Sequence, residues 1–376
     1  MRILFVNYAP ISSMKGTERF FVLLGNYLTK KGHEVFYLSA SNCPVKGLGM
    51  TKKVDFQVFD TNFIKLGYEF VLHVPRPVIR QIDPDVIYLN TFALYPLLPL
   101  LDYKFIFGTM TFGVEDYANS RGKSSMRFRL YSLFLAVLAK FLYRKENIII
   151  HVLNEEQPKW LKAIGFAGFR VSKLPLPIDC NTCKPKPFLW KDQRKFQVLY
   201  IGGIGESKGI IKFLEIVKIL LRKNRTPEIH FCIVGTGKLV DAVVDFCSRN
   251  PSVEYLGAVS DSMKIDLLNE SAILLSPSNN ENFHVVSAEA QICGLPVISS
   301  DISGPREIIE DGLTGRLIDK SCIDDFVKAV IEYFEMWTKD FPSYMNLRKV
   351  ISERAKRFCD SVIFPHLLEM FVDAST

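Results

Sequence analysis

The first half of the chain alternates short, continuous apolar runs with longer stretches of helical spacing. The run from Ile3 to Val6 leads through a loop containing Pro, Ser and Gly into FFVLLGNYLTKKGHEV, where Gly32 predicts the end of a helix and Val35 the start of a second strand. Apolar strands that alternate with amphipathic helices are typical of a parallel sheet with both faces covered. Three further strands are predicted in this half: VIYLN (86–90), KFIFGTM (104–110) and NIIIHVLN (147–154).

The alternation restarts after a charged, proline-containing segment that ends at Lys195. Because a chain of 376 residues exceeds what one hydrophobic core usually organises, we expect two doubly wound α/β domains. They are residues 1–188, joined by a C-terminal helix at 352–376, and residues 189–351. Ligands of such sheets bind beyond the carboxyl ends of the strands, in loops that lead into helices. The second half is predicted to contain strands at 196–203, 230–235, 253–257, 273–278 and 296–300, and a helix at 210–223.

The composition, 48% hydrophobic and 23% charged, is that of a globular protein. The net charge of +7 is uneven, because residues 1–180 carry 23 Lys and Arg against 14 Asp and Glu, whereas the remainder carries 24 against 26. A basic half favours an anionic surface as partner, either phospholipid or a phosphorylated acceptor, and a solvated basic face is the alternative. Basic runs interleaved with aromatic residues are absent from the sequence, so nucleic acid is not an expected partner.

The eight cysteines are scattered, and the close pair Cys180 and Cys183 has neither a second pair nor a nearby histidine. We therefore expect reduced, buried thiols and no zinc site. Asp83-Pro-Asp85 precedes a strand, at the wrong end of the sheet for a ligand, so no catalytic metal is expected there. The first residues lack a signal peptide pattern, and no segment offers about 20 uncharged apolar residues. The cytoplasm is the expected compartment.

The stretch SPSNNENFHVVSAEAQICGLPVIS holds the most informative candidate residues. Glu281 lies on the loop after a strand, and Glu289 lies eight positions later. A helix that starts near Phe283, with Asn282 as its N-cap, presents unpaired amides that bind a diphosphate. Carboxylates accept hydrogen bonds from vicinal hydroxyls, so one glutamate can hold a sugar and the other a ribose. The amides expected at the diphosphate are those of His284, Val285 and Val286.

This pair of glutamates with seven residues between them resembles the signature of the retaining GT-B glycosyltransferases of family 4. The resemblance continues through Gly294-Leu-Pro-Val and Gly304-Pro-Arg-Glu to Asp311-Gly-Leu-Thr-Gly. It implies two Rossmann-like domains facing a central cleft, an acceptor-side domain first and a domain binding the nucleotide sugar second. It also implies a donor linked to a nucleoside diphosphate, UDP or GDP, with no cofactor and no metal. Glu281 would contact the transferred sugar and Glu289 the ribose.

A second segment, IGGIGESKG (201–209), resembles the family motif in which an arginine and a lysine embrace the donor phosphates. Lys208 fits the lysine and is, with Glu281, a catalytic candidate, whereas Gly203 stands where the arginine is expected. His284 occupies a position that is usually glycine in the family. We hypothesise that His284, at the start of the helix, supplies a hydrogen-bond donor that partly replaces the missing arginine.

In the first half, Lys15-Gly16-Thr17-Glu18 resembles the family's Gly-Gly-x-Glu loop, in which Gly16 would let backbone amides approach the donor; a plain turn is the alternative. Residues 121–145 read as a basic amphipathic helix. Such a helix could lie on an anionic membrane at its inner face, and packing on the domain's own sheet is the alternative.

The resemblance implies retaining transfer of a sugar to a hydroxyl of a saccharide or glycolipid acceptor, in assembly of a cell-surface polysaccharide or lipopolysaccharide. Two alternatives come from the departures at Gly203 and His284 and from the fold: a catalytically impaired nucleotide-binding subunit of a glycosylation complex, and a GT-B epimerase acting on the sugar nucleotide. A nicotinamide dehydrogenase would need a glycine fingerprint followed by an acidic residue at the next strand end, which is poorly met here.

Overall fold

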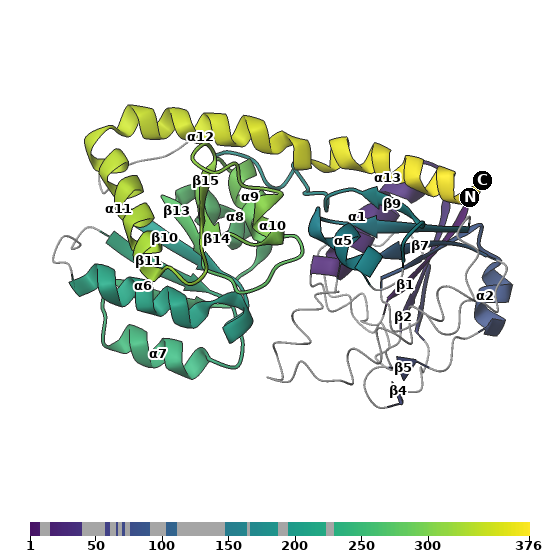
Figure 1. The fold of residues 1–376 in the computed structure, drawn as a ribbon, viewed down its shortest axis with the longest axis horizontal. Helices are drawn as coiled ribbons and strands as arrows, with labels where there is room; N and C mark the ends of the chain where they lie inside the picture. Colours follow the sequence, from purple (N-terminus) through teal and green to yellow (C-terminus); the bar gives the residue numbers. More distant parts are fainter. Residues whose placement is uncertain are drawn as a thin grey trace. The chain divides into compact units, whose positions relative to one another are not determined.

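The computed structural model describes residues 1–7, 16–39, 57–60, 65–66, 70–71, 76–90, 103–110, 147–163, 166–186, 195–222 and 229–376. The chain divides into two units: Met1–Pro177 with Ser361–Thr376, called unit 1, and Ile178–Asp360, called unit 2 (Figure 1). Residues 121–145, predicted as a basic amphipathic helix, lie outside the described part of the chain. Among the described helices, none is both long enough and apolar enough to cross a membrane.

Unit 1 is built on a parallel sheet whose described strands follow the order β3-β2-β1-β6-β7-β8-β9. The strands are β1 Arg2–Asn7, β2 Glu34–Ser39, β3 Gln57–Asp60, β6 Val86–Leu89, β7 Lys104–Gly108, β8 Ile148–Val152 and β9 Arg170–Lys173, with a separate antiparallel pair, β4 Lys65–Leu66 and β5 Phe70–Val71. The helices are α1 Gly16–Lys30, α2 Arg76–Ile82, α5 Glu156–Ala163 and α13 Asp360–Ser375. Each strand predicted in this half is present, because its apolar run fills the buried centre of the sheet.

Unit 2 has a second parallel sheet, in the order β12-β11-β10-β13-β14-β15. Its strands are β10 Phe196–Ile201, β11 Ile229–Val234, β12 Val253–Gly257, β13 Ile273–Ser276, β14 Val297–Ser300 and β15 Gly315–Ile318. The helices are η4 Glu206–Lys208, α6 Ile210–Arg222, α7 Val240–Ser248, α8 Asp261–Glu270, α9 Val285–Ile292, α10 Ser303–Arg306, α11 Ile323–Lys339, α12 Phe341–Ala355 and η5 Lys356–Phe358. The predicted strands and the helix at 210–223 are confirmed to within a few residues. The order reverses between β10 and β13, which is where doubly wound sheets bind their ligands.

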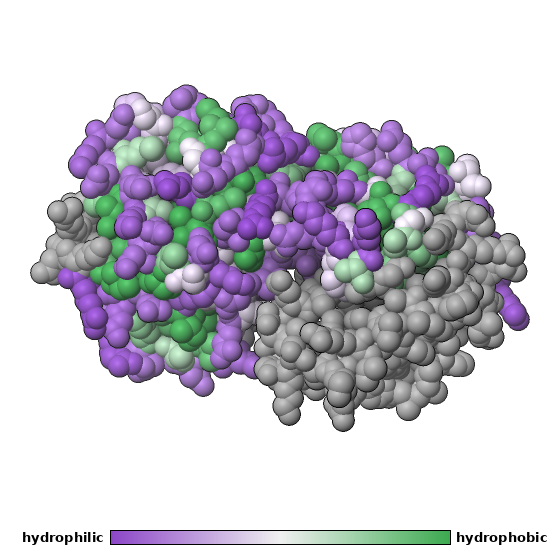
Figure 2. Space-filling view, viewed as in Figure 1, coloured by the Kyte–Doolittle hydropathy of each residue, from purple (hydrophilic) through white to green (hydrophobic). Residues whose placement is uncertain are grey.

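Helices cover both faces of the unit 2 sheet. Phe213 of α6 and Val243 of α7 share one buried cluster with Phe196, Val198 and Tyr200, which point to one side of β10. Helices α8 and α9 lie on the opposite face (Figure 1). Figure 2 shows a surface on which hydrophilic and hydrophobic residues are mixed. The buried residues of α13 are apolar and include Ile363, Leu367 and Phe371. The carboxyl ends of β10 and β13 are occupied by the loops that follow these strands.

The predicted domain boundaries differ from the observed ones, because α12 belongs to unit 2. Tyr344 is fully buried and its hydroxyl donates to the carbonyl of Ala272 at 2.7 Å. The buried guanidinium of Arg348 donates to the carbonyls of Ser271 at 2.8 Å and Asn269 at 3.0 Å. The chain therefore changes unit at 177/178 and 360/361 rather than at 188/189 and 351/352.

The expectation of reduced, buried cysteines is wrong in part, because Cys180 and Cys359 form a disulfide and Cys322 is exposed. The bond lies where unit 2 begins and ends. There the amide of Ile178 donates to the carbonyl of Phe358 at 2.8 Å, and the amide of Asp360 donates back to Ile178 at 2.8 Å. The two cysteines of the disulfide are 179 positions apart in the sequence. Local sequence patterns therefore do not reveal their pairing. Disulfides are uncommon in a reducing cytoplasm, so the redox state of this bond in the cell tests the expected compartment.

Replacing Cys359 by serine should lower the free energy of unfolding of unit 2 by about 2–4 kcal/mol, because the disulfide closes a long loop and so restricts the unfolded chain. Urea unfolding of the oxidised protein measures the change. Cys322, an exposed free cysteine of the same unit, provides the control Cys322→Ser, which should leave stability unchanged. Equal stability of the Cys359→Ser variant and the unaltered protein would mean that the bond does not form in solution.

Candidate functional site

The candidate site of unit 2 lies on two loops, one after β10 and one after β13. The turn between η4 and α6 brings the loops together at Gly209, whose φ is +72°. A Cβ atom at this position would lie 1.9 Å from the carbonyl oxygen of Pro277, so only glycine permits this packing. The amide of Asn279 also donates to the carbonyl of Ser207 at 2.9 Å. The two segments with family resemblance are therefore adjacent in space.

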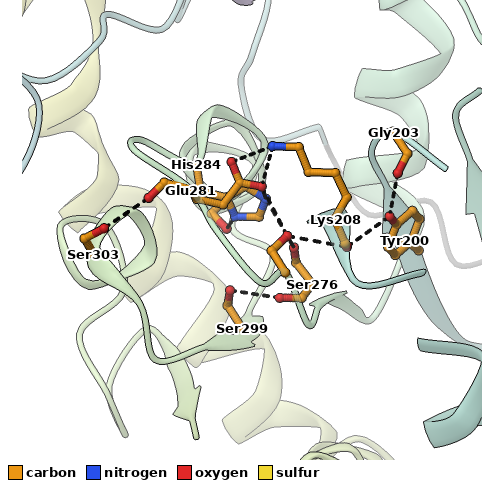
Figure 3. A network of polar contacts seen from close by, with 10 residues as sticks. Tyr200, Gly203, Lys208, Ser276, Glu281, His284, Ser299 and Ser303 are labelled. Atoms are coloured by element: carbon orange, nitrogen blue, oxygen red, sulfur yellow. Dashed lines mark hydrogen bonds and ion pairs between the residues drawn. The ribbon is translucent and has the colours of Figure 1, made fainter. Parts of the chain in front are cut away.

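The predicted catalytic pair forms an ion pair across these loops (Figure 3). Nζ of Lys208 lies 2.9 Å from Oε1 and 2.8 Å from Oε2 of Glu281. The glutamate side chain is 8% exposed and the lysine side chain 39%, so the carboxylate is buried beneath an accessible ammonium group. The hydroxyl of Tyr200 lies 3.1 Å from the carbonyl of Lys208, which fixes the start of the turn. Burial, and secondarily Glu281, raises the pKa of Tyr200, so this hydroxyl stays protonated and donates.

The segment Gly304-Pro-Arg-Glu holds the main chain of Glu281. The carbonyl of Glu281 accepts from the amide of Gly304 at 3.0 Å and from the hydroxyl of Ser303 at 3.2 Å. A Cβ atom at Gly304 would lie 2.7 Å from that carbonyl oxygen, which explains the glycine. Oε1 of Glu281 also accepts from the hydroxyl of Ser278 at 3.1 Å. Hydrogen bonds to the main chain and to the side chain of Glu281 thus both fix the position of its carboxylate.

The helix that carries Glu289 begins two residues later than predicted. Helix α9 starts at Val285 with His284 as its N-cap, not near Phe283 with Asn282 as the cap. Phe283 is buried, and its carbonyl accepts from the amide of Val285 at 3.1 Å. Phe283 therefore belongs to the loop before the helix and not to the helix itself. Val285 and Val286 remain in the first turn, at the positive end of the helix, where amides face anions.

The imidazole of His284 points into the protein rather than out of it. Its side chain is 7% exposed, with Nδ1 at 2.5 Å from the hydroxyl of Ser287 and Nε2 at 3.2 Å from that of Ser276. Burial lowers the pKa of His284, more than nearby Glu281 raises it, so the ring is neutral. The hypothesis that His284 donates to a phosphate stays a prediction, and it requires the ring to leave both serines.

Glu289 lies in the second turn of α9, and its Oε1 is 2.6 Å from Nζ of Lys264 in α8. The side chains of Lys264 and Glu289 are 14% and 6% exposed. Lys264 was not a candidate from the sequence, because its partner lies 25 positions away and no motif marks it. Each glutamate of the signature therefore forms an ion pair with a lysine: Glu281 with Lys208, and Glu289 with Lys264.

The two remaining candidates are glycines. Gly203 is exposed, and a Cβ atom there would lie 3.7 Å from Cγ of Lys208, an ordinary contact, so the loop has room for a larger residue. Gly16 begins α1 in unit 1, and a Cβ atom there would meet no described atom within 4 Å. Packing against the described residues of unit 1 therefore gives no reason for glycine at this position. Within the described ranges, no group of three or more His, Cys, Asp or Glu residues is arranged to hold a metal.

The fold of the chain is that of the GT-B glycosyltransferases. Residues 185–358 match the family Glycosyl transferases group 1, and this match supports the resemblance to family 4 in that part of the chain. An uncharacterized glycosyltransferase of Methanocaldococcus jannaschii is 28% identical over 43% of this chain and 42% of its own length. The capsular polysaccharide biosynthesis glycosyltransferase CapM of Staphylococcus aureus is 27% identical over 60% of this chain and 58% of its own.

In each of these alignments the chain thus spans about half of the relative's own length. The crystal structure of HepE from Anabaena, in complex with UDP and glucose, is similar over 99% of both chains, with a TM-score of 0.74 and 17% identity. This likeness extends over unit 1 as well as unit 2. The predicted GT-B fold, with two Rossmann-like units, is therefore confirmed.

Proposed function

We propose that this protein transfers a sugar, with retention of anomeric configuration, from a nucleoside diphosphate to a hydroxyl of a saccharide or lipid-linked acceptor. The observation that carries the proposal is the Lys208–Glu281 ion pair beside the start of α9, with Glu289 in the second turn of that helix. In the proposed complex one carboxylate lies before the helix terminus that binds the diphosphate, and one lies after it. Such a pair suits a ligand with hydroxyls on both sides of a diphosphate.

In the donor complex Lys208 turns from Glu281 toward the diphosphate, because the two phosphates carry more negative charge than the carboxylate. There it stabilises the charge that develops on the departing diphosphate, together with the amides of Val285 and Val286. Glu281 then accepts hydrogen bonds from the sugar and holds it in position. Glu289 accepts from the ribose hydroxyls. No metal ion takes part in these steps.

The donor is a UDP or GDP sugar, and the acceptor belongs to a cell-surface glycan. Support comes from HepE, whose crystal structure contains UDP and glucose, and from CapM, which acts in capsular polysaccharide biosynthesis. A lipid-linked acceptor would bring the reaction to the inner face of the membrane, where the basic first half of the chain favours anionic lipid.

Thermal unfolding with UDP, GDP, ADP, CMP and NAD, each with and without EDTA, tests the donor site. One nucleoside diphosphate, at about 100 times its Kd, should add roughly 2.7 kcal/mol of stability, and EDTA should not change this gain. A gain with NAD alone, or with no diphosphate, contradicts the proposal. A gain with a diphosphate but no sugar transfer to any acceptor would favour an impaired binding subunit, and conversion of the donor sugar without acceptor would indicate an epimerase.

A further inference from the structure

A row of hydroxyl groups and one imidazole connects α9 with Glu281. The hydroxyl of Ser287 lies 2.5 Å from Nδ1 of His284, and Nε2 of His284 lies 3.2 Å from the hydroxyl of Ser276. The hydroxyls of Ser276 and Ser278 are 3.3 Å apart, and that of Ser278 lies 3.1 Å from Oε1 of Glu281. His284, Ser276 and Glu281 lie side by side in Figure 3. All five residues are buried.

The directions of the hydrogen bonds in this row are derived from the carboxylate at its end. The hydroxyl of Ser278 lies 3.1 Å from Oε1 of Glu281 and 3.5 Å from the carbonyl of Lys208, so it donates to the nearer, charged acceptor. A hydroxyl has one proton, so Ser278 must accept from Ser276.

The proton of Ser276 is thereby committed to Ser278, and Ser276 must in turn accept from Nε2 of His284. A neutral imidazole with a proton on Nε2 has none on Nδ1, so Nδ1 accepts from Ser287. Each group in the row then donates once toward the carboxylate.

We propose that His284 is a positioning residue for Glu281, that its ring is the Nε2–H tautomer, and that it acts through Ser276 and Ser278. The part of this inference that concerns the sugar rests on the proposed function. Hydrogen bonds aligned in one direction polarise one another and end here on a charge, which strengthens the row. Ser276 ends strand β13, so the row ties the carboxylate to the rigid sheet.

The consequence for Glu281 is a difference between its two oxygens. Oε1 accepts from Ser278 as well as from Lys208, whereas the hydrogen bond to Oε2 within the described chain comes from Lys208. When Lys208 moves to the diphosphate, Oε1 keeps Ser278 and Oε2 becomes the acceptor for the sugar hydroxyl. A glycine, the usual family residue here, could not form this row. In this chain the histidine therefore sets the orientation of the sugar-binding carboxylate.

Two substitutions separate this role from simple filling of space. The amide nitrogen of glutamine can take the place of Nε2, so His284→Gln keeps the donor to Ser276. Asparagine reaches only the place of Nδ1, so His284→Asn keeps the contact with Ser287 and interrupts the row. His284→Asn should lower kcat of sugar transfer about 10-fold or more. The affinity for the free nucleoside diphosphate should change less than about 2-fold, because in this proposal the ring stays on Ser276 and Ser287 and does not turn to a phosphate. His284→Gln should stay within about 3-fold of the unaltered rate.

Ser299→Ala is the matched control, since the Ser299 hydroxyl donates to the main-chain carbonyl of Ser276 at 3.0 Å and lies outside the row. It should leave kcat unchanged. Equal losses of rate in the glutamine and asparagine variants, or parallel losses of rate and of diphosphate affinity, would overturn the positioning role.

The tautomer is tested without any activity, by nitrogen NMR of the ligand-free protein labelled in its six histidines. The signals missing from the His284→Gln variant identify the residue. We expect a protonated Nε2 and a bare Nδ1. A protonated Nδ1 would overturn the inference even if the enzyme transfers sugar. The predicted tautomer in a protein that transfers no sugar would support the row and count against the proposed function instead.

Discussion

Replacing Lys208 by methionine should reduce sugar transfer by about 100- to 1,000-fold, because the departing diphosphate loses its side-chain cation in a site where Gly203 supplies none. Methionine keeps most of the aliphatic stem, so the loop keeps its packing. The substitution also leaves the buried carboxylate of Glu281 without its ammonium partner. Initial rates at saturating donor measure the loss.

Lys218→Met provides a matched control, since Lys218 is an exposed lysine of α6 that lies outside the site. Its rate should equal that of the unaltered protein. If Lys208→Met retained more than about a tenth of the activity, electrostatic stabilisation by this lysine would not be a main source of catalysis.

Replacing Gly209 by alanine should destabilise unit 2 by about 3 kcal/mol or more. The positive φ of +72° costs an alanine about 1–2 kcal/mol, and the methyl group would also meet the carbonyl oxygen of Pro277 at 1.9 Å. Relief of that clash must separate the loop after β10 from the loop after β13, so binding of a nucleoside diphosphate should be lost together with stability. Urea unfolding and a nucleotide titration measure the two effects.

Gly205→Ala is the comparison for this variant, because a Cβ atom at Gly205 meets no described atom within 4 Å and its φ of −159° is open to any residue. It should change stability by less than about 1 kcal/mol. Similar stability of the two variants would show that the close packing at Gly209 does not exist in solution.

Most of the fold could be predicted from the sequence, because strands buried on both faces of a parallel sheet are largely apolar. Ile273–Ser276 and Phe196–Ile201 are examples, each with a single polar residue. The limits of α9 were harder to predict. Asn282 is a good N-cap by residue type, yet burial of Phe283 and the contacts of His284 delay the helix by two residues. Local preference gives way to tertiary packing at this point.

The candidate site was predictable only where a motif marked it. Glu281, Glu289 and Lys208 became candidates because their spacing resembles a family pattern. Lys264 and the Cys180–Cys359 bond were not found, since each joins segments far apart in the chain and leaves no periodic signal. The orientation of the His284 ring could not be predicted for a similar reason, because its partner Ser276 belongs to the strand before the loop. Residue type alone suggested a ring turned toward the ligand.

The disulfide also changes the covalent topology of the chain. Unit 2 is inserted into unit 1 between Pro177 and Ser361, and its two ends are linked to each other through Cys180 and Cys359. Residues 180–359 therefore form a closed covalent ring with the rest of the chain as two tails. A protease that cuts once anywhere inside the ring opens it without releasing a fragment, so the nicked oxidised protein keeps its full mass until a reductant divides it in two.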